Sequence, residues 1–461
     1  MKKLILTFAM MCLGLMLEAK QKPNFIFIMV DDAGYGDFSC YGQKLFKTPN
    51  IDRMAAAGMK FTQHYAGSTV CAPTRCSLLN GVHTGHAYVR GNREVQPEGQ
   101  APIPADLITI PKLLKEAGYT TGMFGKWGLG APGSSGDPVN QGWDEFYGYN
   151  CQRQAHTFYP KHLWHNDKKV MLDGKTYSHD LIHEQSLKFI RDNAKKPFFA
   201  YLPITIPHAA MQCPEEDVAP FRKKFPQFED LIGKYSHGTQ VKNPVAAFAG
   251  MMTRMDRGIG ELLELLDELK IADNTLVLFT SDNGPHYEGG HKPGFFNSNG
   301  PLRGHKRDLY EGGIRVPLIV KWPGQVKAGS TNGFRTGFED WIPTLLDLIG
   351  AEGKTPTDVD GISIAPTLLG KRQHERPFLY REFTGYGGQQ AVWMGQWKGI
   401  RQRMLRPNNK NPLKIELYNL KTDIGEQTDV ASKHPEVVAQ LRKLMANQHV
   451  PSKDFPFKPI D

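Results

Sequence analysis

Two apolar runs that end abruptly in acidic residues constrain the fold of this chain more than any other feature. NFIFIMVDD spans residues 24–32, and TLVLFTSDNG spans residues 275–284. Both are rich in β-branched and aromatic residues, which is typical of a strand buried on both faces of a parallel sheet. Three similar runs occupy residues 119–128, 197–208 and 316–324. We therefore expect strands at these places, with polar side chains where they end.

Helical patterns alternate with these strands and favour an α/β sheet covered on both faces. They occupy residues 49–58, 109–118, 256–270 and 341–350, and three of the four end in glycine, as helices commonly do. From about residue 376, short strand-like pieces precede one amphipathic helix. We predict a mixed α/β domain over residues 20–375 and a smaller C-terminal α+β subdomain over residues 376–461.

The first 19 residues predict export. Two lysines precede an apolar stretch from Leu4 to Leu17, and Glu18 and Ala19 follow it, which is the order of a secretory signal peptide. No later run approaches the roughly 18 apolar residues of a membrane span. We expect a periplasmic or secreted protein with no stable membrane insertion.

The charge and the cysteines limit the classes of partner and the redox state. The formal net charge of +9 suits a polyanionic substrate, and it suits a solvated basic surface equally well. No basic stripe or base-stacking motif accompanies that charge, so we do not expect nucleic-acid binding. Without Cys12 in the signal peptide, the chain keeps five cysteines, which cannot all form disulfides.

Oxygen-bearing side chains end two of the predicted strands. Asp31 and Asp32 close one strand, and Asp282 and Asn283 close another. One such pair alone is more typical of a residue that caps a turn or helix, but two pairs ending two similar strands favour a site. These oxygens suit a hard divalent cation, with Ca²⁺ expected first and Mg²⁺ second, and no Cys/His cluster has zinc-like spacing.

Cys71 lies in CAPTR, immediately before a predicted helix. Pro73 and Thr74 provide a helix start signal, and Arg75 follows. A cysteine in this position is more often a small buried apolar residue than a nucleophile. However, a helix N-terminus beside an arginine binds phosphate or sulfate well, so chemistry on a tetrahedral oxyanion is plausible here.

Three more cationic groups complete the candidate catalytic set. Lys126 and His208 each follow a strand-like run, and Lys306 lies in a glycine-containing loop. Each alone is more typical of a solvated or structural side chain. Because ligands gather at the carboxyl ends of parallel strands, we expect Lys126 and His208 at the same sheet edge as the acidic residues.

These residues together resemble the formylglycine-dependent (type I) sulfatases. CAPTR matches the Cys-x-Pro-x-Arg signature of that family. The other matches follow in the order found in the family, from residue 24 to about residue 431, and include NFIFIMVDDAGYGDFSCYG, GYTTGMFGKWGLG, TSDNGPH, RGHKRDLYEGGIRVPLIVKWPG and ELYNLKTDIGEQTDVA. The resemblance implies an alkaline-phosphatase-like fold and conversion of Cys71 to formylglycine by a formylglycine-generating or maturase enzyme.

The resemblance also assigns roles to the candidate residues. It implies that the calcium ligands are Asp31, Asp32, Asp282, Asn283 and the modified Cys71. Arg75 and Lys126 would hold the nucleophile and the sulfate. His208 and Lys306 would contact the ester side, and one of them would protonate the leaving alcohol.

One position departs from the family pattern. Many members read Gly-Lys-Trp-His-Leu-Gly, whereas this chain has Gly128 where that histidine would stand. The histidine is credited with taking the proton that allows formylglycine to regenerate. Another histidine, such as His86, or a water molecule would have to replace it.

Substrate selectivity is expected from polar loops outside the sulfate pocket. These are GHAYVRGN at 85–92 and the loop at 148–166, together with His286. The candidate sugar-binding residues are Arg90, Asn92, Arg153, His156 and His286, although packing within the loops explains such residues equally well. The pattern resembles bacterial carbohydrate sulfatases, which favours galactose or N-acetylgalactosamine sulfates, with 4-O-sulfate as the expected position.

Two other functions are compatible with the sequence. One is a phosphomonoesterase or phosphonate hydrolase of the same fold. The other is a sulfated-glycan binding protein without catalytic activity, which the glycine at position 128 and the positive charge suggest.

Overall fold

A computed structural model describes residues 22–461, so the signal peptide predicted over residues 1–19 lies outside the described residues. The centre of the molecule is a sheet of eleven strands. Its spatial order is β12-β2-β11-β10-β1-β7-β3-β4-β5-β6, and β13 pairs with β2. The strands are β1 (Asn24–Val30), β2 (Met59–Tyr65), β3 (Thr120–Lys126), β4 (Glu145–Tyr149), β5 (His162–His165), β6 (Lys168–Met171), β7 (Phe198–Ile204), β10 (Thr275–Ser281), β11 (Arg315–Lys321), β12 (Ser330–Asn332) and β13 (Thr336–Gly337).

The middle of the sheet is parallel, and its edges are mixed. Strand β1 pairs in parallel with β10 on one side and β7 on the other, and β7 and β4 both pair in parallel with β3. Strand β11 runs antiparallel to β10. All five predicted strands are present. Because β1, β10, β7 and β3 point the same way, their carboxyl ends meet at one edge of the sheet.

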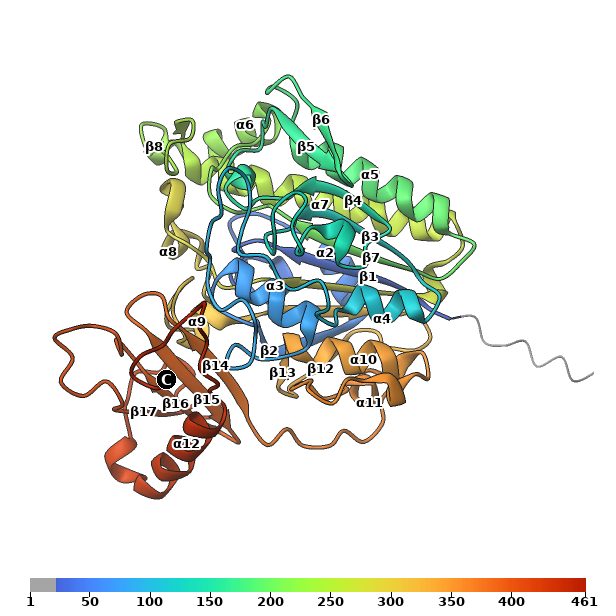
Figure 1. Cartoon of the computed structure of the whole chain (residues 1–461). Helices are drawn as coiled ribbons and strands as arrows, with labels where there is room; N and C mark the ends of the chain where they lie inside the picture. Colours follow the sequence, from blue (N-terminus) through green and yellow to red (C-terminus); the bar gives the residue numbers. More distant parts are fainter. Residues whose placement is uncertain (1–21) are drawn as a thin grey trace, which may run out of the picture.

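Helices cover both faces of the sheet, as predicted, and each face has its own apolar core (Figure 1). One face carries α3 (Cys71–Asn80), α4 (Ile110–Glu116), α10 (Trp341–Leu348) and α11 (Ala365–Leu368). The opposite face carries α2 (Pro49–Ala56), α5 (Ser178–Asn193), α6 (Glu215–Lys224) and α7 (Pro244–Glu268). This arrangement is the mixed α/β sheet flanked by helices that the sequence predicts.

Helix α7 begins earlier than its predicted start at residue 256. The Asn243 side chain caps it by accepting a hydrogen bond from the Ala246 backbone N–H at 2.9 Å. Residues 244–252 are all buried, so this part of the helix has no polar face. An amphipathic period can identify only the later, half-exposed turns of such a helix.

A second, smaller sheet forms the C-terminal part of the chain. It is antiparallel, in the order β14 (Leu379–Phe383), β15 (Gln389–Met394), β16 (Trp397–Arg401) and β17 (Glu416–Asn419). Side chains such as Trp393 join the core of the large domain, while Val392 and Leu417 pack beneath α12 (Pro435–Asn447). The small sheet is therefore held between the main domain and its own helix (Figure 1).

The shorter elements lie in the loops. They are β8 (Ile232–Gly233), β9 (Val241–Lys242), α8 (Pro293–Phe296) and α9 (Glu311–Ile314). None of the helices in residues 22–461 combines the length and the apolar content that a membrane span requires. All five cysteines in the same range are free thiols, which is consistent with the expectation that they cannot all pair.

Candidate active site

The acidic residues that end β1 and β10 meet at the carboxyl edge of the sheet. The Asp32 backbone N–H donates to Asp282 Oδ1 at 3.0 Å, and Asn283 Nδ2 donates to Asp32 Oδ1 at 2.7 Å. Asp31, Asp32, Asp282 and Asn283 are each 0% exposed. In-register pairing of Val30 with Ser281 places the four side chains next to one another.

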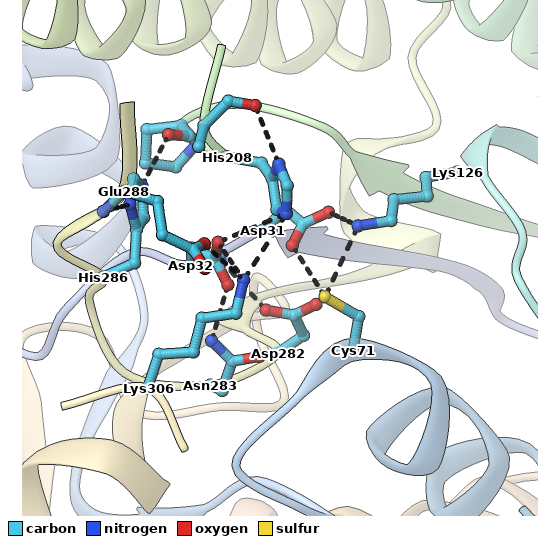
Figure 2. Close-up of polar contacts among 12 residues, drawn as sticks. Asp31, Asp32, Cys71, Lys126, His208, Asp282, Asn283, His286, Glu288 and Lys306 are labelled. Atoms are coloured by element: carbon cyan, nitrogen blue, oxygen red, sulfur yellow. Dashed lines mark hydrogen bonds and ion pairs between the residues drawn. The ribbon is translucent and has the colours of Figure 1, made fainter. Parts of the chain in front are cut away.

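Cys71 lies beside this cluster (Figure 2). Its Sγ is 3.3 Å from Asp31 Oδ1 and 3.4 Å from Lys126 Nζ. Helix α3 begins at Cys71, two residues before the start that Pro73 suggested, because the first helical turn makes no use of the N–H that proline lacks. Burial and the nearby Asp31 raise the pKa of the Cys71 thiol well above its usual value. An unmodified thiol here is therefore protonated and a weak nucleophile.

Two cations hold the Asp31 side of the site. Lys126 Nζ lies 2.6 Å from Asp31 Oδ2, and both side chains are buried. Arg75 Nη2 lies 3.4 Å from the same oxygen and 3.1 Å from Asp282 Oδ2. Arg75 lies one turn after the first residue of α3, so the helix directs it at the base of the cluster.

Two further groups hold the Asp32 side. Lys306 Nζ lies 2.7 Å from Asp32 Oδ2 and 3.4 Å from His208 Nε2. His208 Nε2 is 3.6 Å from the same Asp32 oxygen, and its Nδ1 lies 2.9 Å from the Ala209 carbonyl. The expectation that the strand ends gather the cations is confirmed.

Charge in the cluster is unevenly balanced. Burial alone would raise the pKa of Asp31, but the charge of Lys126 lowers it well below its usual value. Burial and the Asp31 carboxylate instead raise the pKa of Asp282 to about 7. Burial lowers the pKa of His208 well below its usual value, and Lys126 lowers it further. The protein's own cations thus leave Asp282 incompletely neutralised, while His208 is a neutral imidazole.

The residues fit a hard divalent cation. Asp31, Asp32, Cys71 and His208 offer atoms that all lie within 4.8 Å of one another. Within residues 22–461, the buried Asn283 Oδ1 has no hydrogen-bond donor, so this amide oxygen is available as a ligand. Carboxylate and amide oxygens are the ligands that Ca²⁺ prefers, which favours the predicted aspartate and asparagine set over the imidazole of His208.

Three predicted sugar-binding residues lie near the cluster. Asn92 Oδ1 accepts a hydrogen bond from the Ala72 backbone N–H at 3.0 Å, directly after Cys71. The His156 ring stacks on the His208 ring with 5.2 Å between their centroids, and the centroid of the His286 ring lies 6.2 Å from that of His208. Burial and the Lys126 charge lower the pKa of His156 to about 4. The imidazole of His156 is therefore neutral and can hydrogen-bond to an uncharged group.

The other two predicted sugar-binding residues hydrogen-bond elsewhere. Arg90 Nη1 is buried, 3.0 Å from Glu382 Oε1 and 2.7 Å from the Val450 carbonyl. It joins the loop after α3 to the C-terminal part of the chain. The Arg153 side chain is 40% exposed, and its Nη1 lies 3.4 Å from Glu94 Oε2. These contacts occupy both guanidinium groups, and a role in sugar binding stays a prediction for them.

The structure does not bring His86 to Cys71. His86 follows the C-terminal end of α3, whose ten residues place its two ends about 15 Å apart. His86 Nδ1 lies 2.9 Å from Asp360 Oδ1, so it is paired at the far end of the helix. The suggestion that His86 replaces the missing histidine is corrected, since the helix separates the two side chains.

The space beside Gly128 is filled by Gln152. Gly128 has a φ of +99°, and a Cβ there would lie 2.5 Å from Gln152 Nε2. The Gln152 backbone N–H donates to Gln100 Oε1 at 2.8 Å, which fixes this loop against its neighbour. A histidine at position 128 therefore has no room while Gln152 keeps its place.

Sequence reasoning missed Glu288 and Tyr235. Glu288 Oε2 lies 3.4 Å from Lys306 Nζ, and its other oxygen pairs with Arg307. The Tyr235 ring lies edge-on against His208, 5.5 Å between centroids. Glu288 follows the β10 strand end by a few residues and could have been proposed from that position, whereas no local pattern identifies Tyr235.

Comparison with known proteins identifies the family of this site. Residues 23–351 match the family model described as Sulfatase. The chain belongs to the sulfatase family. Residues 304–450 also match the model described as N-sulphoglucosamine sulphohydrolase, C-terminal. This sulfatase is 32% identical to N-acetylgalactosamine-6-sulfatase of Homo sapiens over 87% of its own length and 78% of that protein. It is 29% identical to N-acetylgalactosamine-6-O-sulfatase of Bacteroides thetaiotaomicron over 93% of each chain.

Solved structures agree with this assignment. The sulfatase matches the crystal structure of Ps i-CgsB in complex with k-i-k-neocarrahexaose, with a TM-score of 0.78, 29% identity and 93% of each chain covered. It also matches the phosphonate monoester hydrolase of Agrobacterium radiobacter, with a TM-score of 0.65 at 20% identity over 95% of this chain and 99% of that one, which shows a shared fold alone. The protein is thus a sulfuric ester hydrolase of the alkaline-phosphatase-like fold.

Proposed function

We propose that this sulfatase releases sulfate from galactose or N-acetylgalactosamine units of carbohydrates, using formylglycine made from Cys71 and a bound Ca²⁺ ion. The observation that carries the proposal is the position of Cys71, buried 3.3 Å from Asp31 and 3.4 Å from Lys126. Two relatives whose printed names specify N-acetylgalactosamine support the sugar. Their names specify the 6-position, so the 4-O-sulfate suggested by the sequence stays a prediction to be tested beside 6-O-sulfate.

The proposal includes export and maturation. The signal peptide predicted over residues 1–19 directs the chain to the periplasm or beyond, and a formylglycine-generating or maturase enzyme converts Cys71 before folding buries it. The folded thiol is 1% exposed, which supports conversion before the chain has folded.

The nucleophile side of the site stabilises charge. When present, the formylglycine hydrate supplies the attacking hydroxyl, and Ca²⁺ held by the aspartates and Asn283 supplies positive charge next to it. Arg75 and Lys126 lie on the same side and donate hydrogen bonds to the sulfate oxygens, where negative charge builds up during transfer. Such prearranged donors in a buried site stabilise the transition state more than they do in water.

The leaving-group side holds a proton. Burial opposes the charge on Lys306, but Asp32 raises its pKa well above the usual value, so it stays protonated. His208 is neutral, and Nδ1–H donates to the Ala209 carbonyl, which leaves Nε2 as an acceptor 3.4 Å from Lys306 Nζ. This pair therefore holds a proton at Nζ that can pass directly, or through His208 Nε2, to the leaving alcohol.

The test uses protein whose conversion at residue 71 has been confirmed by peptide mass. Sulfate release is measured by ion chromatography from the 4-O- and 6-O-sulfates of galactose and N-acetylgalactosamine, with Cys71→Ala protein as the control. We expect release from at least one of the four by the converted protein and none by the control. Absence of release from all four would refute the proposed sugar class.

Two further measurements, turnover of aryl substrates and calorimetry, separate the two alternatives. A phosphomonoesterase or phosphonate hydrolase would turn over an aryl phosphate or phosphonate faster than the matching aryl sulfate. A non-catalytic binding protein would bind the sulfated sugars in calorimetry without releasing sulfate. We expect the aryl sulfate to be the preferred aryl substrate.

A further inference from the structure

A polar cavity of about 770 Å³ lies beside the loop that carries Lys306. Its volume is in the range of pockets that hold a small-molecule ligand, about 300–1,000 Å³. The cavity is lined by one segment of the large domain and by the loops of the small C-terminal sheet. The lining includes Arg303, Tyr310, Tyr386, Arg403, Arg406 and Lys414.

Positive charge dominates this cavity. Four of its lining residues are lysine or arginine, and two, Asp308 and Glu416, are acidic. Both acids already accept hydrogen bonds within the protein. Glu416 Oε2 accepts from the Tyr310 hydroxyl at 2.7 Å, and Asp308 Oδ2 accepts from the His305 backbone N–H at 3.1 Å. The lining therefore carries two more positive than negative side chains, four against two.

Three of the cations are available to a ligand. Arg403, Arg406 and Lys414 are exposed, and within residues 22–461 none of them forms an ion pair. Arg303 differs from them, because its guanidinium stacks over the Tyr310 ring at 3.8 Å and donates to the Glu426 carbonyl at 2.6 Å. The cavity thus combines one fixed arginine with three unpaired cations, which is an arrangement for binding anions.

The walls of the cavity are held in place by backbone contacts. The Met404 N–H donates to the Gly388 carbonyl at 3.0 Å, and the Leu405 N–H donates to the Gly387 carbonyl at 2.7 Å. Tyr386 and Arg403 both have a left-handed φ of 55°. Non-glycine residues rarely adopt this conformation, and such residues gather where a ligand is clamped.

The cavity is connected to the sulfate site through side chains. The Arg307 guanidinium lies over the Tyr386 ring, 5.9 Å from its centroid, and it also pairs with Glu288. Glu288 in turn lies 3.4 Å from Lys306 Nζ, which belongs to the site itself (Figure 2). Tyr386 is 59% exposed and offers a flat face for a sugar ring between the two places.

We infer that this cavity binds an anionic sugar unit next to the one that loses its sulfate, so the substrate is an oligosaccharide that carries a second sulfate or carboxylate. This inference rests on the proposed sulfatase action at Cys71. Tyr386 would support the chain between the two units, and Arg403, Arg406 and Lys414 would bind the second anionic group. A monosaccharide would not reach the cavity.

The test reverses two of the exposed cations. The variant Arg406→Glu/Lys414→Glu is compared with Lys433→Glu/Lys443→Glu, which makes the same change in net charge at exposed positions near or on α12. The substrates are 6-O-sulfated N-acetylgalactosamine and three tetrasaccharides in which that unit is followed by a uronate, a second sulfated sugar or a neutral sugar. The uronate and sulfate arms identify which anionic group the cavity binds.

We expect the cavity variant to lower kcat/KM for an anionic tetrasaccharide about 100-fold, through KM, because each lost charge-assisted hydrogen bond costs about tenfold. Its kcat/KM for the monosaccharide and for the neutral tetrasaccharide should stay within about twofold of wild type, and the control variant should match wild type on all four. Equal losses on all substrates, or no loss on any, would overturn the inference while leaving the sulfatase activity established.

Failure of the proposed sugar class gives a different result. If wild-type protein releases sulfate from none of the substrates, calorimetry with Cys71→Ala protein still measures binding of the tetrasaccharides. The inference then requires that Arg406→Glu/Lys414→Glu weaken binding of an anionic tetrasaccharide at least tenfold relative to Lys433→Glu/Lys443→Glu. Equal binding by the two variants would refute it.

Discussion

Gly128 lies where a side chain has no room, so replacing it with alanine should lower the stability of the folded protein. In Gly128→Ala, the new Cβ would lie 2.5 Å from Gln152 Nε2 and 2.6 Å from Gln152 Cγ. The amide end of Gln152 can move, but Cγ lies close to a backbone held by its hydrogen bond to Gln100. The φ of +99° adds strain for any residue with a Cβ.

Two costs add in this variant. The positive φ costs about 1–2 kcal/mol, and forcing an extra carbon into a filled space costs about 1–3 kcal/mol. At an unfolding entropy of about 2 cal/mol/K per residue, a chain of 461 residues loses about 1 °C of Tm per kcal/mol. We therefore expect Gly128→Ala to lower Tm by about 2–5 °C.

Two further variants separate the costs in a calorimetric or dye-based melting assay. Gly133 has a φ of +76° and nothing within 4 Å of its Cβ position, so Gly133→Ala has only the backbone cost, about 1–2 °C. Adding Gln152→Ala to Gly128→Ala removes the clash, so the two substitutions together should cost about 1–3 kcal/mol less than their separate effects predict. The reasoning about this space is wrong if Gly128→Ala and Gly133→Ala have the same Tm. It is also wrong if adding Gln152→Ala to Gly128→Ala costs as much stability as the two separate effects predict.

Three other predictions concern catalysis, the metal and pH. Cys71→Ser should lower sulfate release at least about a thousandfold, with Tm little changed. The control Cys76→Ala, in the same helix, should keep the kcat of wild type. Equal losses of activity in the two variants would contradict the assigned nucleophile. Chelation of Ca²⁺ should lower Tm and activity, and saturating Ca²⁺ should restore about 3 kcal/mol of stability. If Tm changes with neither the chelator nor added Ca²⁺, a structural calcium site is excluded. Burial opposes the charge on His449, but the hydrogen bond that its Nδ1–H donates to Glu382 raises its pKa. The stabilisation from protonated His449 is fully present below the unfolded-state pKa of about 6.5 and is lost as pH rises through the raised value. The Tm difference between wild type and His449→Gln should therefore be larger at pH 6 than at pH 9, and a constant or reversed difference would show that the pair does not contribute in this way.

Much of the candidate active site could be predicted because each part has a local signal. Asp31 and Asp282 follow strands whose residues are entirely buried, and such strands are recognisable from their β-branched and aromatic content. Parallel pairing then brings their ends together without further information. CAPTR adds a helix start signal at Pro73 and Thr74, two residues after the candidate nucleophile, and the helix begins at that nucleophile, Cys71.

Other parts could not be predicted because their partners are distant in the chain. Arg90 resembles a sugar-binding residue in its loop, but it pairs with Glu382 almost 300 residues later. His86 is near Cys71 in sequence and remote in space, because a straight helix separates them. The first turns of α7 were not predicted, because residues that are buried on every side of a helix show no amphipathic period.

The amino-acid order by itself determined where strands end, which polar groups stand at those ends, and that a helix starts within about two residues of Cys71, since backbone propensity and side-chain pattern act over a few residues. Only the tertiary structure decided which charges neutralise one another, that Gln152 fills the space at Gly128, and that loops of the small sheet form a basic cavity beside Lys306. These features depend on distances between segments far apart in the chain, and both charge interactions and steric exclusion change steeply over a few ångströms.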